Sequence, residues 1–225
     1  MSKLICIEGP DSVGKSTITR EVSGRLFVST PDLWIFSHEP TFDSKTADEL
    51  NFLKGDPWQR EFYFMKDRLD HQAFLNKNDV VLDRYSLTGI VYAEVFSTPV
   101  VHDMCRSIYV LPEFKKPDIV FLLRMDPKDL VRLNESRKGT DEYNPDYNVN
   151  IATQLQKSFT RNLDFLEHTN TKYEIVDCEI GKIDEISEYI TNTTINFYYG
   201  ENNEVERLQT NKEDTILHEE NDINK

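Results

Sequence analysis

The sequence predicts an α/β domain with a parallel β-sheet that helices cover on both faces. Short apolar runs alternate along the chain with longer segments of helical periodicity, which is the pattern of repeated βαβ units. The run from Ile119 to Leu123 is apolar throughout, as a strand buried on both faces of a parallel sheet should be. Five runs have this strand character, at residues 4–8, 33–37, 80–83, 119–125 and 173–176.

The first run leads into the motif G-x-x-x-x-G-K-S, and helical periodicity begins directly after it. The two glycines let the backbone turn its N–H groups around a phosphate, and the helix start directs its positive dipole end at the same anion. The lysine places a charge near the β- and γ-phosphates, and the serine offers a hydroxyl to Mg²⁺. The segment is therefore predicted to bind a nucleoside triphosphate through Gly9, Asp11, Ser12, Val13, Gly14, Lys15, Ser16 and Thr17.

Polar residues also follow the next two strands. Glu39 comes after the second strand, and Asp83 with Arg84 closes the third. Ligands of parallel sheets bind at the carboxyl ends of the strands, so these side chains are expected beside the phosphate loop. Asp83 could then hold the Mg²⁺ shell while Arg84 grips a phosphate with two hydrogen bonds. The alternative is an ion pair that only solvates a strand end.

A polar stretch at residues 134–148 lies between two helical segments and is predicted to be a mobile lid. Arg137 lies within it, and Arg132 precedes it on the helix. An arginine that closes over the γ-phosphate would stabilise the charge of the transition state and exclude water. An exposed charged loop is the alternative interpretation.

Phe64 and Arg68 are four residues apart in a helical stretch and therefore share one face. A ring for stacking and a guanidinium for a carbonyl edge would suit a nucleobase. On the pattern alone, a core phenylalanine beside a surface arginine is the better explanation.

Composition limits the partners and the compartment. The net charge of −14 argues against a nucleic-acid surface, which needs patches of Lys and Arg. The three cysteines form no C-x-x-C pair, which favours a reduced, cytoplasmic protein. We expect no signal peptide, because the first strand begins almost at Met1, and no apolar run reaches membrane-spanning length. Residues 1–198 are predicted to be the folded domain and 199–225 an acidic, disordered tail.

Several motifs in this order resemble those of thymidylate kinases: E-G-x-D-x-x-G-K-S-T, E-P-T, F-x-x-x-D-R-x-x-H, D-R-Y-S-x-T-G-x-x-Y and P-D-x-x-F-L-L-x-x-D-P. The likeness runs from Lys3 to about residue 148 and more loosely to about residue 196. It implies a P-loop kinase fold with five parallel strands, with ATP and Mg²⁺ as cofactors. The implied reaction transfers the γ-phosphoryl of ATP to a deoxynucleoside monophosphate, dTMP first. Most members of the family dimerise, so a homodimer is implied, without a nucleic-acid or membrane partner.

The resemblance also implies roles for single residues. The catalytic set would be Lys15, Asp83, Arg84 and Arg137, with Ser16 and Asp83 at the metal and Arg132 a second lid candidate on the ATP side. Asp11 matches an acid that binds the 3′-hydroxyl, and Arg84 matches the arginine on the acceptor phosphate. The remaining substrate-binding residues would be Glu39, Phe64, Arg68, Thr88, Tyr92 and Tyr143.

Three departures from the family pattern bear on specificity. Ser12 stands where one subgroup has an arginine, His38 stands where an arginine usually precedes E-P, and the lid sequence D-R-[FIY]-E is D-E-Y-N here. A broad-specificity deoxynucleoside monophosphate kinase therefore remains an alternative.

Two other functions stay open on the sequence. A deoxynucleoside kinase would act on a 5′-hydroxyl and needs a carboxylate base, for which Glu39 is the candidate. A nucleotide-dependent switch or ATPase would instead act on a macromolecular partner, with the acidic tail as its contact.

Overall fold

A single parallel sheet organises the part of the chain that the computed structural model describes, residues 2–41, 57–140 and 143–200. The strand order is β2-β3-β1-β4-β5, and every neighbouring pair is parallel. The fold class is thereby confirmed, and each strand begins and ends within one residue of its predicted bounds. The strands are β1 (Leu4–Glu8), β2 (Trp34–His38), β3 (Asp79–Asp83), β4 (Ile119–Arg124) and β5 (Lys172–Asp177).

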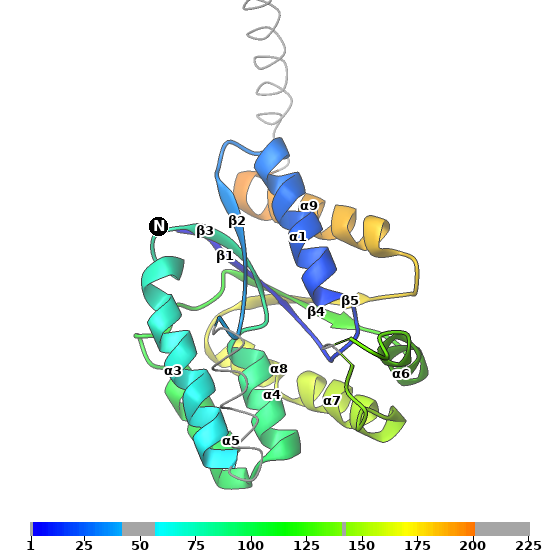
Figure 1. Cartoon of the computed structure of the whole chain (residues 1–225). Helices are drawn as coiled ribbons and strands as arrows, with labels where there is room; N and C mark the ends of the chain where they lie inside the picture. Colours follow the sequence, from blue (N-terminus) through cyan, green and yellow to red (C-terminus); the bar gives the residue numbers. More distant parts are fainter. Residues whose placement is uncertain (1, 42–56, 141–142, 201–225) are drawn as a thin grey trace, which may run out of the picture.

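Helices cover both faces of the sheet (Figure 1). On one face lie α1 (Lys15–Ser29) and α9 (Ile183–Tyr199). On the other face lie α3 (Pro57–Leu75), α4 (Ser86–Phe96), α5 (Pro99–Tyr109), α7 (Val149–Arg161) and α8 (Leu163–His168). The short helix α6 (Pro127–Glu135) follows β4 at the carboxyl edge of the sheet.

The apolar runs form the core because both sheet faces are covered. All residues of β1 are buried, and β4 is buried from Ile119 to Leu123. Alternate side chains of a strand point to opposite faces, so an apolar run throughout is what two covered faces require. The three cysteines are free thiols buried in this interior.

Side-chain caps fix where the helices around the predicted lid begin. Asp126 accepts a hydrogen bond from the backbone N of Lys128 (2.8 Å) at the start of α6. Asn148 accepts from the backbone N of Asn150 and Ile151 (3.0 and 3.2 Å) at the start of α7. Such caps satisfy N–H groups that the first turn leaves unpaired, so the segment between α6 and α7 is bounded by its own sequence.

The last helix is tied to the amino-terminal end of the sheet. The ammonium of Lys3 pairs with Asp32, donates to the hydroxyl of Tyr199 (3.1 Å) and lies 5.7 Å from the ring centre of Trp34. Helix α9 ends at Tyr199, one residue beyond the predicted domain boundary, and residues 201–225 of the predicted tail lie outside the described residues.

Among the described helices, none combines the length and the apolar character needed to span a bilayer.

Candidate active site

The loop between β1 and α1 has the geometry of a phosphate-binding loop. Gly9 has a φ of +146°, and a Cβ there would lie 2.6 Å from the carbonyl oxygen of Leu123 in β4. Only glycine accommodates both constraints, so the loop packs tightly onto the neighbouring strand. Gly14, with a φ of +96°, is the N-cap of α1. The first N–H groups of the helix therefore face the carboxyl edge of the sheet, where an anion would bind.

Lys15 is a buried cation at this loop. Its ammonium donates to the carbonyl of Pro10 (2.6 Å), and only 4% of the residue is exposed. Burial, together with the positive charge of Arg84, lowers the pKa of Lys15 to about 7. A bound polyphosphate would add negative charge close to this ammonium and so favour its protonated form.

Ser16, at the start of α1, contacts Asp83, at the end of β3. The Ser16 hydroxyl donates to Oδ2 of Asp83, which ends β3. Oδ1 of Asp83 is buried and has no hydrogen-bond partner among the described residues. A buried carboxylate oxygen beside a hydroxyl is a donor set that fits Mg²⁺, which binds through one or two protein oxygens together with phosphates. The described residues contain no cluster of three acidic, histidine or cysteine side chains that could hold a metal without such phosphates.

Arg84 joins the third strand to the phosphate loop. Its guanidinium pairs with the carboxylate of Asp11 and lies 3.4 Å from the hydroxyl of Tyr92. Burial works against the charge on Asp11, but Arg84 and Lys15 outweigh it and hold the pKa of that carboxyl below its usual value. Arg84 itself has a φ of +67°, and its backbone N donates to the carbonyl of Ile7 (3.1 Å). A non-glycine residue in this left-handed region is strained, as is common at functional sites.

A buried acid supports the turn that carries Arg84. Glu8 is 1% exposed, and its carboxylate accepts hydrogen bonds from the backbone N of Tyr85 (3.0 Å) and from the hydroxyl of Thr88. Burial raises the pKa of Glu8. The hydroxyl of Thr88, a residue expected to contact substrate, thus donates to Glu8 in this structure.

The loop, Arg84 and the lid segment line one hollow of about 420 Å³. Arg137 lines it, whereas Arg132, the other lid candidate, is exposed on α6 and absent from the lining. Arg20 also lines it, one helical turn beyond Ser16, with its guanidinium 5.0 Å from the ring centre of Phe36. The complete lining is Asp11, Ser12, Gly14, Lys15, Ser16, Thr17, Arg20, Arg84, Asn134, Arg137 and Asn144.

Two lid residues that the sequence analysis missed have well-defined contacts. Asn134 is 1% exposed; its side chain donates to the carbonyl of Asn144 (2.8 Å) and accepts from the backbone N of Asn144 (3.1 Å). Tyr147 is 3% exposed, and its hydroxyl donates to the backbone carbonyl of Asp11 (3.1 Å). The predicted aromatic, Tyr143, instead lies with its hydroxyl 3.4 Å from Oε1 of Glu135. Residues 141–142 of the lid lie outside the described residues.

The two residues predicted to bind the base, Phe64 and Arg68, lie on α3, and Arg68 contacts Glu39, which follows β2. Phe64 is half-buried, and Arg68 is only 4% exposed, so the interpretation of Arg68 as a surface residue is wrong. Nε of Arg68 lies 2.8 Å from Oε2 of Glu39, and the ring of His71 lies 3.2 Å from the other oxygen. Burial makes the Glu39 carboxyl harder to ionise and raises its pKa. Glu39 thus contacts Arg68 and does not line the hollow at the phosphate loop.

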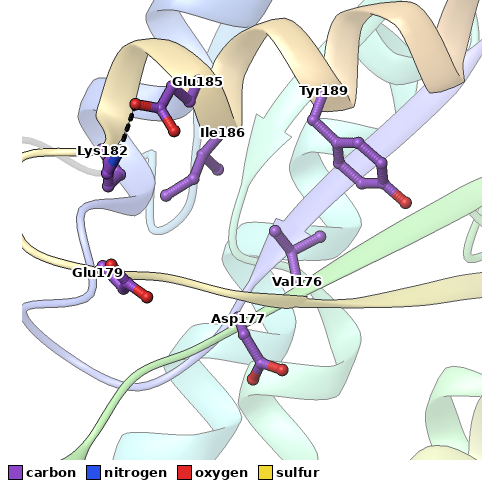
Figure 2. Close-up of a pocket in the computed structure, with 7 residues that line it drawn as sticks. All are labelled: Val176, Asp177, Glu179, Lys182, Glu185, Ile186 and Tyr189. Carbon is purple, nitrogen blue, oxygen red and sulfur yellow. Dashed lines mark hydrogen bonds and ion pairs between the residues drawn. The ribbon is translucent and has the colours of Figure 1, made fainter.

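A second hollow of about 350 Å³ lies between the end of β5 and the start of α9. Figure 2 shows Ile186 of α9 pointing toward Val176 of β5, while Asp177 points to the other side of the strand. Of its four charged lining residues three are acidic, Asp177, Glu179 and Glu185, and Lys182 is already paired with Glu185. A phosphate would be repelled there, so phosphate chemistry belongs to the hollow at the loop.

Comparison with known proteins shows similarity to one family of nucleotide kinases. A family model described as thymidylate kinase matches residues 7–186. The probable thymidylate kinase of Methanococcus maripaludis is 33% identical over 147 residues, covering 61% of this chain and 68% of that protein. The thymidylate kinase of Ruegeria pomeroyi is 25% identical over 186 residues, covering 77% and 85%.

Solved structures show the same fold at lower identity. The thymidylate kinase of Candida albicans aligns with a TM-score of 0.61 at 23% identity, over 87% of this chain and 93% of that one. The deoxyadenosine kinase of M. mycoides aligns with a TM-score of 0.66 at 19% identity, over 85% and 98%. Because the family model extends from β1 into α9 and includes the whole phosphate loop–Arg84 site, this chain belongs to the thymidylate kinase family of nucleotide kinases.

Proposed function

We propose that this chain transfers the γ-phosphoryl group of ATP to the 5′-phosphate of dTMP, giving ADP and dTDP. One observation carries the proposal within the family: two adjacent residues of a single turn both contact the phosphate loop. Asp83 accepts from Ser16, and Arg84 pairs with Asp11. A group that binds the donor side and a group that binds the acceptor side are thus held by one short segment.

The reaction needs alignment and charge neutralisation more than a base. The acceptor is already an anion near neutral pH, because the second pKa of a phosphate monoester is about 6. Two polyanions must be held in line, and preorganised cations supply that. Lys15 would contact the β- and γ-phosphate oxygens, Arg84 the acceptor phosphate and Arg137 the transferred group, since all three line the same hollow.

Ser16 and Asp83 would hold the metal. A Mg²⁺ ion held by these two residues would supply positive charge that offsets the negative charge of the phosphates. The unpartnered Oδ1 of Asp83 supports this assignment, because a buried carboxylate oxygen without a partner is costly unless something binds it.

The nucleoside would extend from Arg84 toward α3. Asp11 and Tyr92, both in contact with Arg84, would contact the deoxyribose. Phe64 would stack on the base, Arg68 would donate to a base carbonyl, and Thr88 would contact the substrate from α4. The buried, fixed position of Arg68 supports a reading role, since a surface arginine would lack a defined orientation.

The contacts of Glu39 weigh against the deoxynucleoside kinase alternative. A base for a 5′-hydroxyl must offer a carboxylate oxygen to the substrate. One oxygen of Glu39 is paired with Arg68, the other lies against His71, and the side chain has no exposed surface.

The direct test is ADP formation with ATP and Mg²⁺ against dTMP, dUMP, dCMP, dAMP, dGMP, UMP and thymidine. We expect strong turnover with dTMP and background turnover with thymidine. Equal use of several deoxynucleotides would favour the broad-specificity alternative, and ATP hydrolysis without any acceptor would favour the switch or ATPase.

A homodimer in the cytoplasm completes the proposal. One face of α3 exposes large apolar side chains, with Trp58 at 45%, Phe62 at 65% and Leu69 at 47% exposure, which supports contact with a second copy. The three buried free thiols support a reducing compartment. Sedimentation of wild type and Phe62→Asp tests the dimer, which that substitution should weaken.

A further inference from the structure

The guanidinium of Arg68 is held by three elements other than its own helix. Glu39 follows β2, Gly89 lies in α4, and Tyr109 ends α5. Tyr109 is 1% exposed, and its hydroxyl accepts a hydrogen bond from Nη1 of Arg68 at 2.6 Å. None of the sequence motifs drew attention to Tyr109, because its contact joins residues 41 positions apart.

The two polar contacts of Arg68 differ in kind. The contact between Nε and Oε2 of Glu39 is a close ion pair at 2.8 Å without hydrogen-bond alignment. The contact with Tyr109 is an aligned hydrogen bond, and the guanidinium carbon lies 5.4 Å from the centre of the same ring. The ion pair with Glu39 therefore attracts the guanidinium of Arg68 without fixing its orientation. The hydrogen bond to Tyr109 fixes the direction in which Nη1 points.

Gly89 provides the space for this arrangement. A Cβ on Gly89 would lie 2.9 Å from Nη1 of Arg68 and 3.0 Å from the hydroxyl of Tyr109. The backbone of Gly89 is helical, so an alanine would be compatible with α4 itself. The requirement for glycine thus comes from the two side chains that meet above it.

We infer that Tyr109 and Gly89 are positioning residues that fix the orientation of Arg68 and thereby set base selectivity. This inference rests on the proposed function, in which Arg68 reads the base. A fixed guanidinium presents N–H donors only, which match a carbonyl such as O4 of thymine. The amino group of cytosine at the same place is also a donor and would leave the buried arginine unpaired, which polar sites reject strongly.

The fixed orientation is what makes this rejection effective. A guanidinium that could reorient through the torsions of its side chain could withdraw its donors from a mismatched base, and rejection would weaken. Loss of one charge-assisted hydrogen bond typically changes binding by about tenfold or more. We therefore expect the hydroxyl of Tyr109 to contribute about that factor to the preference for dTMP over dCMP.

The test compares Tyr109→Phe and Gly89→Ala with matched controls. Tyr198→Phe removes a comparable tyrosine hydrogen bond, to Asp118 at 2.8 Å, from α9, which lies on the opposite face of the sheet from α3. Gly24→Ala adds a methyl group to helix α1 where nothing lies within 4 Å. For each variant, kcat and KM are measured with dTMP and dCMP, the KM for ATP is measured, and thermal unfolding is recorded.

The expected result is a KM for dTMP raised about tenfold and a dTMP-to-dCMP ratio of kcat/KM lowered about tenfold in both variants. The KM for ATP and both controls should stay at wild-type values. A wild-type ratio in Tyr109→Phe would overturn the inference, and so would a loss of kcat and melting temperature with the ratio unchanged.

A second measurement separates this inference from the proposed function. In ¹⁵N-arginine-labelled protein, a held guanidinium gives resolved Nη–H signals for Arg68, which Arg68→Lys identifies by their loss. These signals should be resolved in wild type and averaged in Tyr109→Phe. If wild type does not phosphorylate dTMP, the proposed function fails while this result still supports the held orientation. Averaged signals in wild type would overturn the inference whatever the substrate.

Discussion

The carboxylate of Asp11 pairs with the guanidinium of Arg84 and so joins the phosphate loop to the turn after β3. The pairing follows from strand order, because β1 and β3 are neighbours and their carboxyl ends meet. It places Arg84, Lys15 and the Ser16–Asp83 contact around one hollow. The site is thus organised by main-chain topology, and its charges depend on one another.

Arg84→Ala should lower turnover by about 10³-fold, as loss of comparable phosphate-binding arginines does. Arg84→Lys should recover only part of it, because an ammonium cannot form two parallel hydrogen bonds to a phosphate. ADP formation at saturating ATP, with dTMP varied, measures both. Arg124→Ala is the control: Arg124 pairs with Asp177 on the surface and should matter little. Near-normal turnover of Arg84→Ala would contradict its assigned role.

Lys15 should take up a proton when ATP binds. Its pKa of about 7 lies below its ordinary value of 10.5, so between these values the free protein carries mostly neutral Lys15. A triphosphate favours the charged form and raises the pKa, so uptake is absent well below pH 7 and approaches one proton per site near pH 8.5.

Calorimetry of ATP binding in buffers with different ionisation enthalpies measures this uptake. Lys15→Arg provides the control, because a guanidinium stays protonated at every pH used. Uptake of equal size in Lys15→Arg would show that another group titrates.

The candidate-site residues whose proximity could be predicted from the sequence lie within short segments. The loop from Gly9 to Ser16 and the pair Asp83–Arg84 each follow a strand, so the rule for carboxyl ends of parallel strands was enough to bring them together. A site role for Arg20 could also have been predicted, since it lies four residues after Ser16 on the same helix face. A single arginine on a helix is, however, also typical of a solvent-exposed surface.

Other contacts depend on how distant segments meet in space. The contact of Tyr147 with Asp11 spans 136 positions, and no local period or motif indicates it. Tyr143, the aromatic that the resemblance implied in this segment, lies with its hydroxyl near Glu135, and irregular backbone, unlike a helix, gives no fixed spacing from which such an orientation could be predicted. The burial of Arg68 likewise depends on Glu39 and Tyr109 from other elements, so the i, i+4 pattern could not distinguish it from a surface arginine.

Arg20→Ala should lower kcat/KM about tenfold, the effect of one lost charge-assisted contact to a phosphate. The guanidinium lines the hollow and rests against Phe36, and no ion pair to it is found within the described residues. Arg25→Ala is the matched control from the same helix, since Arg25 pairs with Asp184 and is absent from the lining. Equal losses in the two variants would show a general effect of charge on α1.

Ser16→Ala and Asp83→Asn should each raise the Mg²⁺ concentration needed for half-maximal turnover by about 10- to 100-fold or more, because loss of a residue that only orients a metal ligand already costs that much. The reason is that Ser16 and Asp83 present the hydroxyl and the carboxylate oxygens that suit this ion, and Oδ1 of Asp83 has no other partner among the residues described. Binding of ATP without Mg²⁺ should change little in Ser16→Ala, which separates a metal role from a nucleotide role. Asp177→Asn removes an acid at the end of the outer strand β5, and its Mg²⁺ requirement should equal that of wild type. If Asp83→Asn kept the wild-type requirement while its turnover fell, Asp83 would serve to position Ser16 and Arg84 instead of the metal.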